Sequence, residues 1–317
     1  MFGEERAHVQ LVLHVARQYY EAGLEQREIA EEIGYSRPTV SRLLTEARER
    51  GIVRFTISHP VEQALEHEEA IRQRFGIPEA AVASSAAGAP AVGRLAAGLI
   101  AERGGSRSIL ALSNGTSVGA VVEQMPERHW PYSCVTQMVG SLGEVDRLMV
   151  DSAELCRRLA TRLGGTHRPL PAPIVMSSAV AARSIRREQM VLTTLELAAR
   201  ADIALCGVGA VGPQGSSSGA ILSQHLGPRV VQELRRGGAV GHISGHHFDA
   251  RGRHVTTSLC ERLITMDPER LARIETSMVA AWGTDKVPAL HGLLQTEFVS
   301  CLVTDEPTAR QLLAYRP

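Results

Sequence analysis

Lysine and asparagine are almost absent from this chain of 317 residues. Lysine and arginine together number 34, yet Lys286 is the single lysine, and Asn114 is the single asparagine. Both amino acids have A-rich codons, so a GC-rich genome can remove them wherever arginine or another polar residue serves. Residues that survive such pressure are candidates for positions where substitution fails, and chance survival is the alternative.

Features of membrane, secreted and disulfide-rich proteins are also lacking. No apolar run reaches membrane-spanning length. Met1 begins a polar, charged segment without the apolar core and cleavage site of an export signal. The five cysteines are odd in number, far apart, and match neither a disulfide framework nor a zinc spacing. We therefore expect a cytoplasmic protein with no membrane partner, no metal and no cofactor.

Two kinds of pattern divide the chain near Pro60. Before it, apolar residues at helical spacing mark three segments, 7–22, 26–33 and about 37–50, and a strand-like alternation follows at 52–57. After it, helical runs alternate with short apolar strands that end in Gly/Ser-rich loops, such as SILALSNGTS, SCVTQMVGSLG, ADIALCGVGAVG and AVGHISGHH. This rhythm predicts a parallel α/β sheet with ligands at the carboxyl ends of its strands. The predicted domains are 1–59 and 60–317.

The stretch EIAEEIGYSRPTVSRLL (residues 28–44) fits a helix-turn-helix whose first position is Gln26. Ala30 then stands where two helices cross closely, and Gly34 stands where the turn needs a positive φ. Ser36 can cap the next helix, and Pro38 is tolerated in its first turn. The amino-terminal half of that helix enters the major groove in this motif. The predicted contacts to double-stranded operator DNA are Gln26, Ser36, Arg37, Pro38, Thr39, Ser41, Arg42 and Thr45.

The alternative for this stretch is a helical hairpin with a solvated polar face. Charge is the weak point of the DNA interpretation, because residues 1–60 hold eight arginines and nine glutamates. Since phosphate contacts supply most of the affinity, a single copy should bind DNA weakly. Copies joined symmetrically on paired half-sites would compensate.

The segment YYEAGLEQREIAEEIGYSRPTVSRLLTEARERGIVRFTI resembles the amino-terminal module of the SorC-type, DeoR/SorC-like sugar-responsive transcriptional regulators. The later segments HRPLPAPIV, GAVGHISGHHFDARGR and MVAAWGTDKVPALHGLLQTEFVSCLVTDEPTARQLL agree with this resemblance in order and spacing. It implies a winged helix-turn-helix joined to a large Rossmann-like α/β effector domain, similar to sugar-phosphate isomerases and deaminases. It also implies a homo-oligomer, either a dimer or a tetramer, that releases or rearranges on DNA when a sugar or sugar phosphate binds.

The loop SNGTSV (residues 113–118) lies between a strand-like and a helical run, so its backbone N–H groups can face an anion. A plain strand-to-helix turn is the alternative. The family usually has Trp at the position of Asn114 and Gly-Arg-Thr at Gly115-Thr116-Ser117, and the missing arginine removes a bidentate phosphate donor. The family motif also has a lysine at the position of Lys286. Its ammonium could pair with a phosphate or a sugar hydroxyl, or react as a desolvated amine with an aldehyde.

Two further loops complete the predicted site. GVGAVG (207–212) matches a dinucleotide fingerprint, but the following PQGSSSG cannot begin the helix that a pyrophosphate needs, so we interpret it as a loop beside the effector pocket. GHISGHHFD (241–249) holds three histidines, but its glycines break any helical register and no fourth ligand for zinc lies nearby. The predicted effector-binding residues are Ser113, Asn114, Gly115, Thr116, Ser117, Gly140, Ser141, Gly207, Val208, Gly209, His242, His246, Asp249 and Lys286.

Two functions follow from the sequence. The first is a DNA-binding transcriptional repressor of a carbohydrate-utilisation operon, whose DNA affinity changes when a sugar, polyol or sugar phosphate binds. The second is an isomerase- or deaminase-like enzyme with an accessory DNA-binding domain. An enzyme needs a positioned general base, whereas a sensor needs only binding that differs between two conformations. Because the loops show no clear paired carboxylates, we expect the regulator and no catalytic residues.

Overall fold

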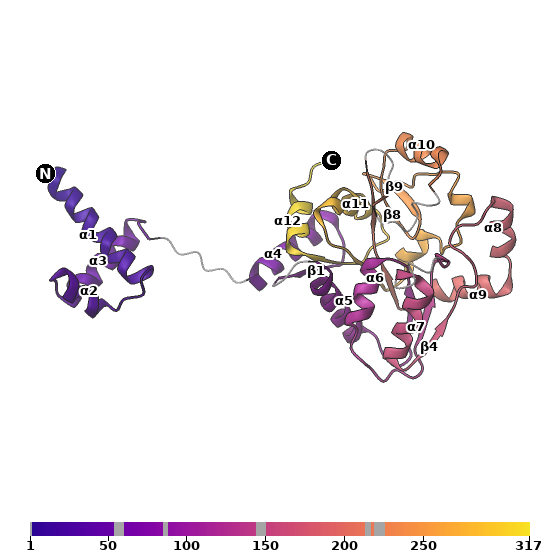
Figure 1. Cartoon of the computed structure of the whole chain (residues 1–317), viewed down its shortest axis with the longest axis horizontal. Coiled ribbons are helices and arrows are strands. Elements are labelled where there is room, and N and C mark those ends of the chain that lie inside the picture. Colours follow the sequence, from indigo (N-terminus) through magenta and orange to yellow (C-terminus); the bar gives the residue numbers. More distant parts are fainter. Residues whose placement is uncertain (1, 54–59, 85–87, 144–149, 213–216, 219–225) are drawn as a thin grey trace. The chain divides into compact units, whose positions relative to one another are not determined.

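The computed structural model describes residues 2–53, 60–84, 88–143, 150–212, 217–218 and 226–317. Contacts between residues divide the chain into two compact units, Met1–Ser58 and His59–Pro317 (Figure 1). Most of the strand predicted at 52–57, which would form a wing, lies outside the described residues.

The amino-terminal unit contains three helices, α1 (Phe2–Tyr20), α2 (Gln26–Ile33) and α3 (Arg37–Glu49). Apolar side chains at helical spacing meet in one core, where Val15 of α1, Ile29 of α2 and Val40 of α3 are fully buried. Ala30 is buried as well, as a close crossing of two helices requires. The helix-turn-helix predicted from these spacings is confirmed.

The turn between α2 and α3 has the predicted local chemistry. Gly34 ends α2 with φ 72° and ψ 30°, a left-handed conformation that costs other residues energy. The Ser36 side chain caps α3 by accepting a hydrogen bond from the Thr39 backbone N–H at 3.4 Å. Two local signals therefore fix where α3 begins.

A seven-stranded sheet forms the centre of the carboxy-terminal unit, in the order β1-β11-β10-β5-β2-β3-β4. Its strands are β1 (Glu79–Ala83), β2 (Ile109–Leu112), β3 (Cys134–Gln137), β4 (Thr166–Arg168), β5 (Ile203–Cys206), β10 (Thr276–Ala280) and β11 (Cys301–Asp305). All of these neighbouring strands pair in parallel, which confirms the predicted sheet type.

Helices cover both faces of this sheet, because successive strand residues point to opposite faces. On β2, Leu110 and Leu112 belong to one core and Ala111 to the other. The first core packs against three neighbouring helices, α5 (Ala89–Arg103), α6 (Thr116–Gln124) and α7 (Ser152–Leu163) (Figure 1). The second core includes residues of α4 (Pro60–Phe75), α9 (Gln189–Ala198), α10 (Pro228–Arg236), α11 (Val287–Leu293) and α12 (Glu306–Ala314). A smaller core lies around α8 (Ala179–Arg186).

A separate antiparallel sheet has the order β7-β6-β8-β9, with β6 (Gly209–Val211), β7 (Ser217–Ser218), β8 (Ala239–Ile243) and β9 (His246–Asp249). The prediction that AVGHISGHH is another strand and loop of the parallel sheet was therefore wrong. Ser244 and Gly245 have φ values of 50° and 89°. Two successive positive φ angles make the tight turn of a hairpin, so the chain reverses there and β9 pairs with β8.

The centre of the parallel sheet holds a topological switch point. β2 and β5 are neighbours, but the chain continues from β2 toward β3 and from β5 toward β10, on opposite sides. The loops that follow these two strands therefore diverge and leave a crevice at the carboxyl ends of the strands, where ligands bind in open α/β sheets.

Candidate functional site

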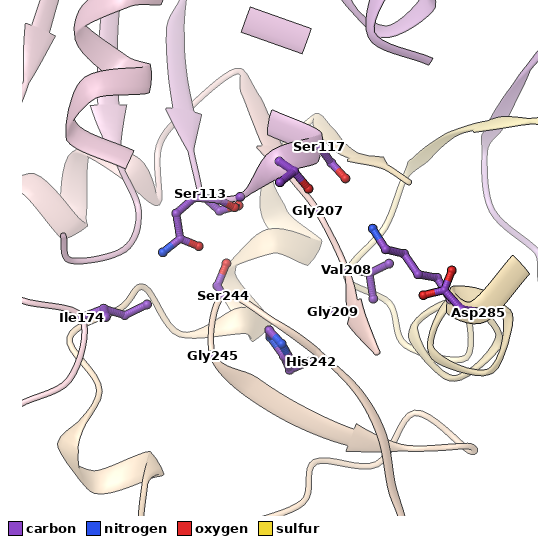
Figure 2. Close-up of a pocket in the computed structure, with 14 residues that line it drawn as sticks. Ser113, Ser117, Ile174, Gly207, Val208, Gly209, His242, Ser244, Gly245 and Asp285 are labelled. Atoms are coloured by element: carbon purple, nitrogen blue, oxygen red, sulfur yellow. The ribbon is translucent and has the colours of Figure 1, made fainter. Parts of the chain in front are cut away.

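A cavity of about 210 Å³ lies at this crevice (Figure 2). The loops after β2, β5 and β10 line it, together with the β8–β9 turn. In Figure 2, Ser113, Ser117 and Gly207 lie on one side, and Ser244, Gly245 and His242 lie opposite. The lining residues are Ser113, Asn114, Gly115, Thr116, Ser117, Ile174, Gly207, Val208, Gly209, His242, Ser244, Gly245, Asp285 and Lys286.

The loop after β2 presents the amino terminus of α6 to the cavity. The Ser113 backbone N–H donates to the Leu205 carbonyl at 3.0 Å, which ties this loop to β5. Gly115 precedes α6 and no side chain caps the helix. Because the first N–H groups of a helix have no partner within the helix, they can donate to a ligand. The positive end of the helix dipole favours an anionic group there.

Asn114 adds an unsatisfied donor to the same loop. The residue is only 9% exposed, and its side-chain nitrogen, Nδ2, is buried without a hydrogen-bond partner among the described residues. Leaving a buried polar group unpaired costs roughly 1–3 kcal/mol. A ligand oxygen that reached this amide would recover that cost.

Lys286 supplies a half-buried ammonium from the loop after β10. It ends a short 3₁₀ helix, Thr284–Lys286, and its Nζ lies 5.4 Å from the centroid of the Trp282 ring. Burial lowers the pKa of Lys286, and neighbouring Asp285 opposes that shift. Lys286 forms no ion pair within the described part of the chain. Its charge is therefore available to a ligand.

His242 gives the cavity an uncharged imidazole. Burial lowers its pKa to about 4, and the charge of Lys286 acts in the same direction. A neutral imidazole can donate one hydrogen bond and accept another, which suits a sugar hydroxyl. Gly209 makes room for this ring, because a Cβ at position 209 would lie 2.1 Å from His242 Nε2.

Two of the predicted effector residues, Gly140 and Ser141, do not line the cavity. A Cβ at Gly140 would lie 2.6 Å from the backbone of Pro173, so glycine permits two loops to cross there. The Ser141 backbone N–H donates to the Ala172 carbonyl at 2.9 Å. Both residues hold the segment after β3 against this second loop.

His246 and Asp249 also lie outside the lining of the cavity. His246 shares a 2.8 Å hydrogen bond with the Thr265 hydroxyl, and burial lowers its pKa to about 3. Asp249 closes the turn after β9 by accepting bonds from the backbone of Arg251 and from the backbone and guanidinium of Arg253. Within the described residues, no group of three or more His, Cys, Asp and Glu side chains is placed to hold a metal ion.

Four lining residues, Ile174, Ser244, Gly245 and Asp285, were not predicted. Asp285 could have been found as the neighbour of Lys286, and the Ser-Gly pair within AVGHISGHH is a turn signal. Ile174 reaches the cavity through the packing of a segment distant in sequence, and no local pattern marks it.

The predicted DNA-contacting residues gather on one face of the helix-turn-helix. Pro38 and Ser41 are exposed, Gln26 is half-buried, and the hydroxyls of Ser36 and Thr39 bond each other at 2.9 Å. The Thr45 hydroxyl donates to the Ser41 carbonyl at 3.0 Å. The guanidinium groups of Arg37 and Arg42 are exposed on the same helix, and neither forms an ion pair with another described residue.

Comparisons with known proteins agree with both units. Residues 59–314 match the family described as "Putative sugar-binding domain", and residues 19–54 match "Winged helix-turn-helix DNA-binding". The full-length sorbitol operon regulator SorC of Klebsiella pneumoniae has a similar structure, with a TM-score of 0.74 and 27% identity over 96% of this chain and 98% of that one. The chain belongs to the SorC family of transcriptional regulators.

Other relatives of this SorC-family protein are regulators as well. It is 30% identical to the deoxyribonucleoside regulator of Bacillus subtilis (strain 168), over 98% of this chain and 99% of the relative. It is also 30% identical to the transcriptional regulator LsrR of Escherichia coli (strain K12), over 95% of this chain and 94% of that relative. The expected transcriptional regulator is thus confirmed, and the alternative of an enzyme is not supported. No helix in the described residues could cross a membrane.

Proposed function

We propose that this SorC-family protein represses a carbohydrate-utilisation operon, and that its affinity for operator DNA changes when a sugar, polyol or sugar phosphate occupies the cavity. One observation carries the proposal. An uncapped helix amino terminus, several hydroxyls and an ammonium converge on one cavity, in a chain whose other unit is a helix-turn-helix. Relatives named for sorbitol and for deoxyribonucleosides support a small polyhydroxylated effector.

Within the cavity, the residues fall into two groups with different chemistry. Ser113 to Ser117 and Lys286 present donors, so this side suits a phosphate or another electron-rich group of the effector. His242 and Ser244 can both donate and accept hydrogen bonds, so the other side suits sugar hydroxyls. We assign effector binding to these two groups.

On the DNA side, we assign the groove-facing role to the exposed face of α3, with Arg37 and Arg42 as its charged donors. Arginine pairs with guanine edges through two parallel hydrogen bonds, or with phosphates through its charge. Because arginines and glutamates almost balance in residues 1–60, we further propose that two or four copies act together on paired half-sites.

Fluorescence anisotropy with labelled duplexes tiled across the protein's own promoter region tests this function. Each binding curve is repeated with sorbitol, fructose, ribose and deoxyribose, and with their phosphates, at one stated salt concentration. We expect one duplex to bind specifically and at least one compound to shift its curve. If a duplex binds specifically but no carbohydrate shifts its curve, the proposed response to carbohydrate is refuted. If no duplex binds specifically, the proposed regulation of this promoter is refuted.

A further inference from the structure

The loop that carries Lys286 is tied to the first turn of α12. The Gly283 backbone N–H donates to the Thr308 hydroxyl at 2.9 Å, and Thr308 is fully buried. The Thr308 backbone N–H in turn donates to Asp305 Oδ1 at 3.1 Å. The other oxygen of this carboxylate, Oδ2, accepts from the Gly88 backbone N–H at 2.8 Å. These bonds between buried and half-buried partners hold the Lys286 loop and the start of α12 together.

The opposite end of α12 is held by Arg74, in the last turn of α4. The Arg74 guanidinium donates to the carbonyls of Leu312, Leu313 and Tyr315, at 2.8, 2.6 and 2.6 Å. The last carbonyls of a helix lack partners within the helix, and a cation there also complements the helix dipole. Burial lowers the pKa of Arg74, and the charge of Arg316 acts in the same direction. The Arg74 guanidinium therefore links the last turn of α4 to the carboxyl end of α12.

A second connection runs through α11, which begins at Val287, directly after Lys286. Its buried His291 ring lies with its centroid 5.7 Å from that of Phe75, the last residue of α4, and 5.3 Å from that of Tyr315. Lys286 thus directly precedes α11, and the loop that carries it is bonded to the first turn of α12. Both helices contact the end of α4. α4 itself begins at Pro60, at the amino-terminal boundary of the unit that holds the cavity.

We infer that the last turn of α4, through Arg74 and Phe75, couples occupancy of the cavity to DNA binding. This inference rests on the proposed function. α12 has nine residues and is about 13 Å long, so it transmits a shift of its first turn to its last turn as a rod. An effector that contacts Lys286 favours one position of the loop, and the Gly283–Thr308 bond fixes the position of α12 accordingly. Arg74 then shifts α4 with α12, and α4 is the helix that follows the segment joining the two units.

Arg74→Gln in the full chain tests the coupling, with Arg72→Gln as the matched control. Arg72 lies on the same helix, and its exposed guanidinium lies 3.2 Å from the Glu69 carboxylate. Operator affinity is measured by anisotropy with and without the panel compound that shifts the wild-type curve most, and the binding of that compound is measured by calorimetry. Allosteric ratios are typically about 5- to 150-fold. We expect Arg74→Gln to bring this ratio to within about twofold of one while both separate affinities remain, and Arg72→Gln to keep the wild-type ratio.

Thr308→Val tests the same coupling at the amino-terminal end of α12. This variant also replaces Arg74→Gln as the test if Arg74→Gln fails to fold. Valine keeps the shape of threonine but cannot accept the Gly283 bond, and Thr193→Val, an exposed site on α9, is its control. We expect the same loss of coupling. A wild-type ratio in both Arg74→Gln and Thr308→Val overturns the inference and leaves the proposed function intact. A wild-type protein that responds to no panel compound refutes the proposed function, and the inference with it.

Discussion

Replacing Lys286 by methionine separates its charge from its packing. Methionine keeps an unbranched apolar stem beside the Trp282 ring and removes the ammonium that lies 5.4 Å from that ring. A hydrogen bond to a charged group contributes about 1.5–3 kcal/mol, and each 1.4 kcal/mol is a factor of ten in affinity. We therefore expect effector binding to weaken roughly 10- to 150-fold, while operator affinity without effector stays within about twofold.

The same substitution should raise thermal stability. Burial lowers the pKa of Lys286, so folding disfavours its charged form relative to the unfolded chain. The charged lysine therefore destabilises the fold at neutral pH, and this penalty fades as the pH rises toward the ordinary lysine pKa. Lys286→Met has no such penalty, so its Tm at pH 7 should exceed that of the wild type.

Calorimetric titration and thermal unfolding check the two effects together, with Lys286→Arg as the charge-retaining control. In the wild type, effector affinity should fall as the pH rises through the lowered pKa of Lys286, which lies below the ordinary lysine pKa. In Lys286→Arg, which stays charged, this fall should be absent. Unchanged effector affinity in Lys286→Met would refute the assignment of Lys286 to the site, and a lowered Tm would refute the electrostatic reasoning.

Three further predictions concern DNA binding, the turn and pH. Arg42→Ala should weaken specific DNA binding by about 1–3 kcal/mol in the anisotropy assay. Arg27→Ala, whose exposed guanidinium lies 3.7 Å from Glu31, should have little effect, and equal effects in the two variants would contradict a groove-facing Arg42. Gly34→Ala should lower the free energy of unfolding by roughly 1–2 kcal/mol, because the residue has φ 72°. Gly34→Asn should lower it less, and circular dichroism of the helices during unfolding measures both changes. An unchanged free energy of unfolding in both variants would show that the turn is unstrained. Burial lowers the pKa values of His242 and His246 to about 4 and 3, so these two residues should leave the Tm unchanged above pH 6.5. Below pH 6.5 the Tm should fall as the pH drops toward the two lowered pKa values, and less steeply in His246→Gln. A constant Tm between pH 6.5 and about pH 4.5 would contradict their burial.

The helix-turn-helix was predictable because its constraints are local. Ala30, Gly34 and Ser36 each satisfy a requirement set by residues a few positions away, and the structure meets all three. The loops at 113–117 and 207–209 were predictable for a different reason. Parallel strands end at one edge of a sheet, so the loops that follow them lie along that edge.

The positions of the predicted residues that do not line the cavity depend on information that the sequence does not contain locally. Gly140 follows β3, which lies one strand further from the switch point than β2, and another loop packs onto it. His246 and Asp249 were expected at a strand end of the parallel sheet, but the hairpin at Ser244 reverses the chain and directs these side chains to Thr265 and Arg253. Strand order and hairpin reversal are set by packing over the whole unit.

The central claim is that one chain links carbohydrate binding in the cavity to DNA binding by the helix-turn-helix. Calorimetric titration of the active carbohydrate into free protein, and into protein saturated with its operator duplex, tests this link most directly. Linkage requires the two dissociation constants to differ by the same factor by which the carbohydrate changes operator affinity. Equal constants in the two titrations, with both ligands bound, would contradict the account.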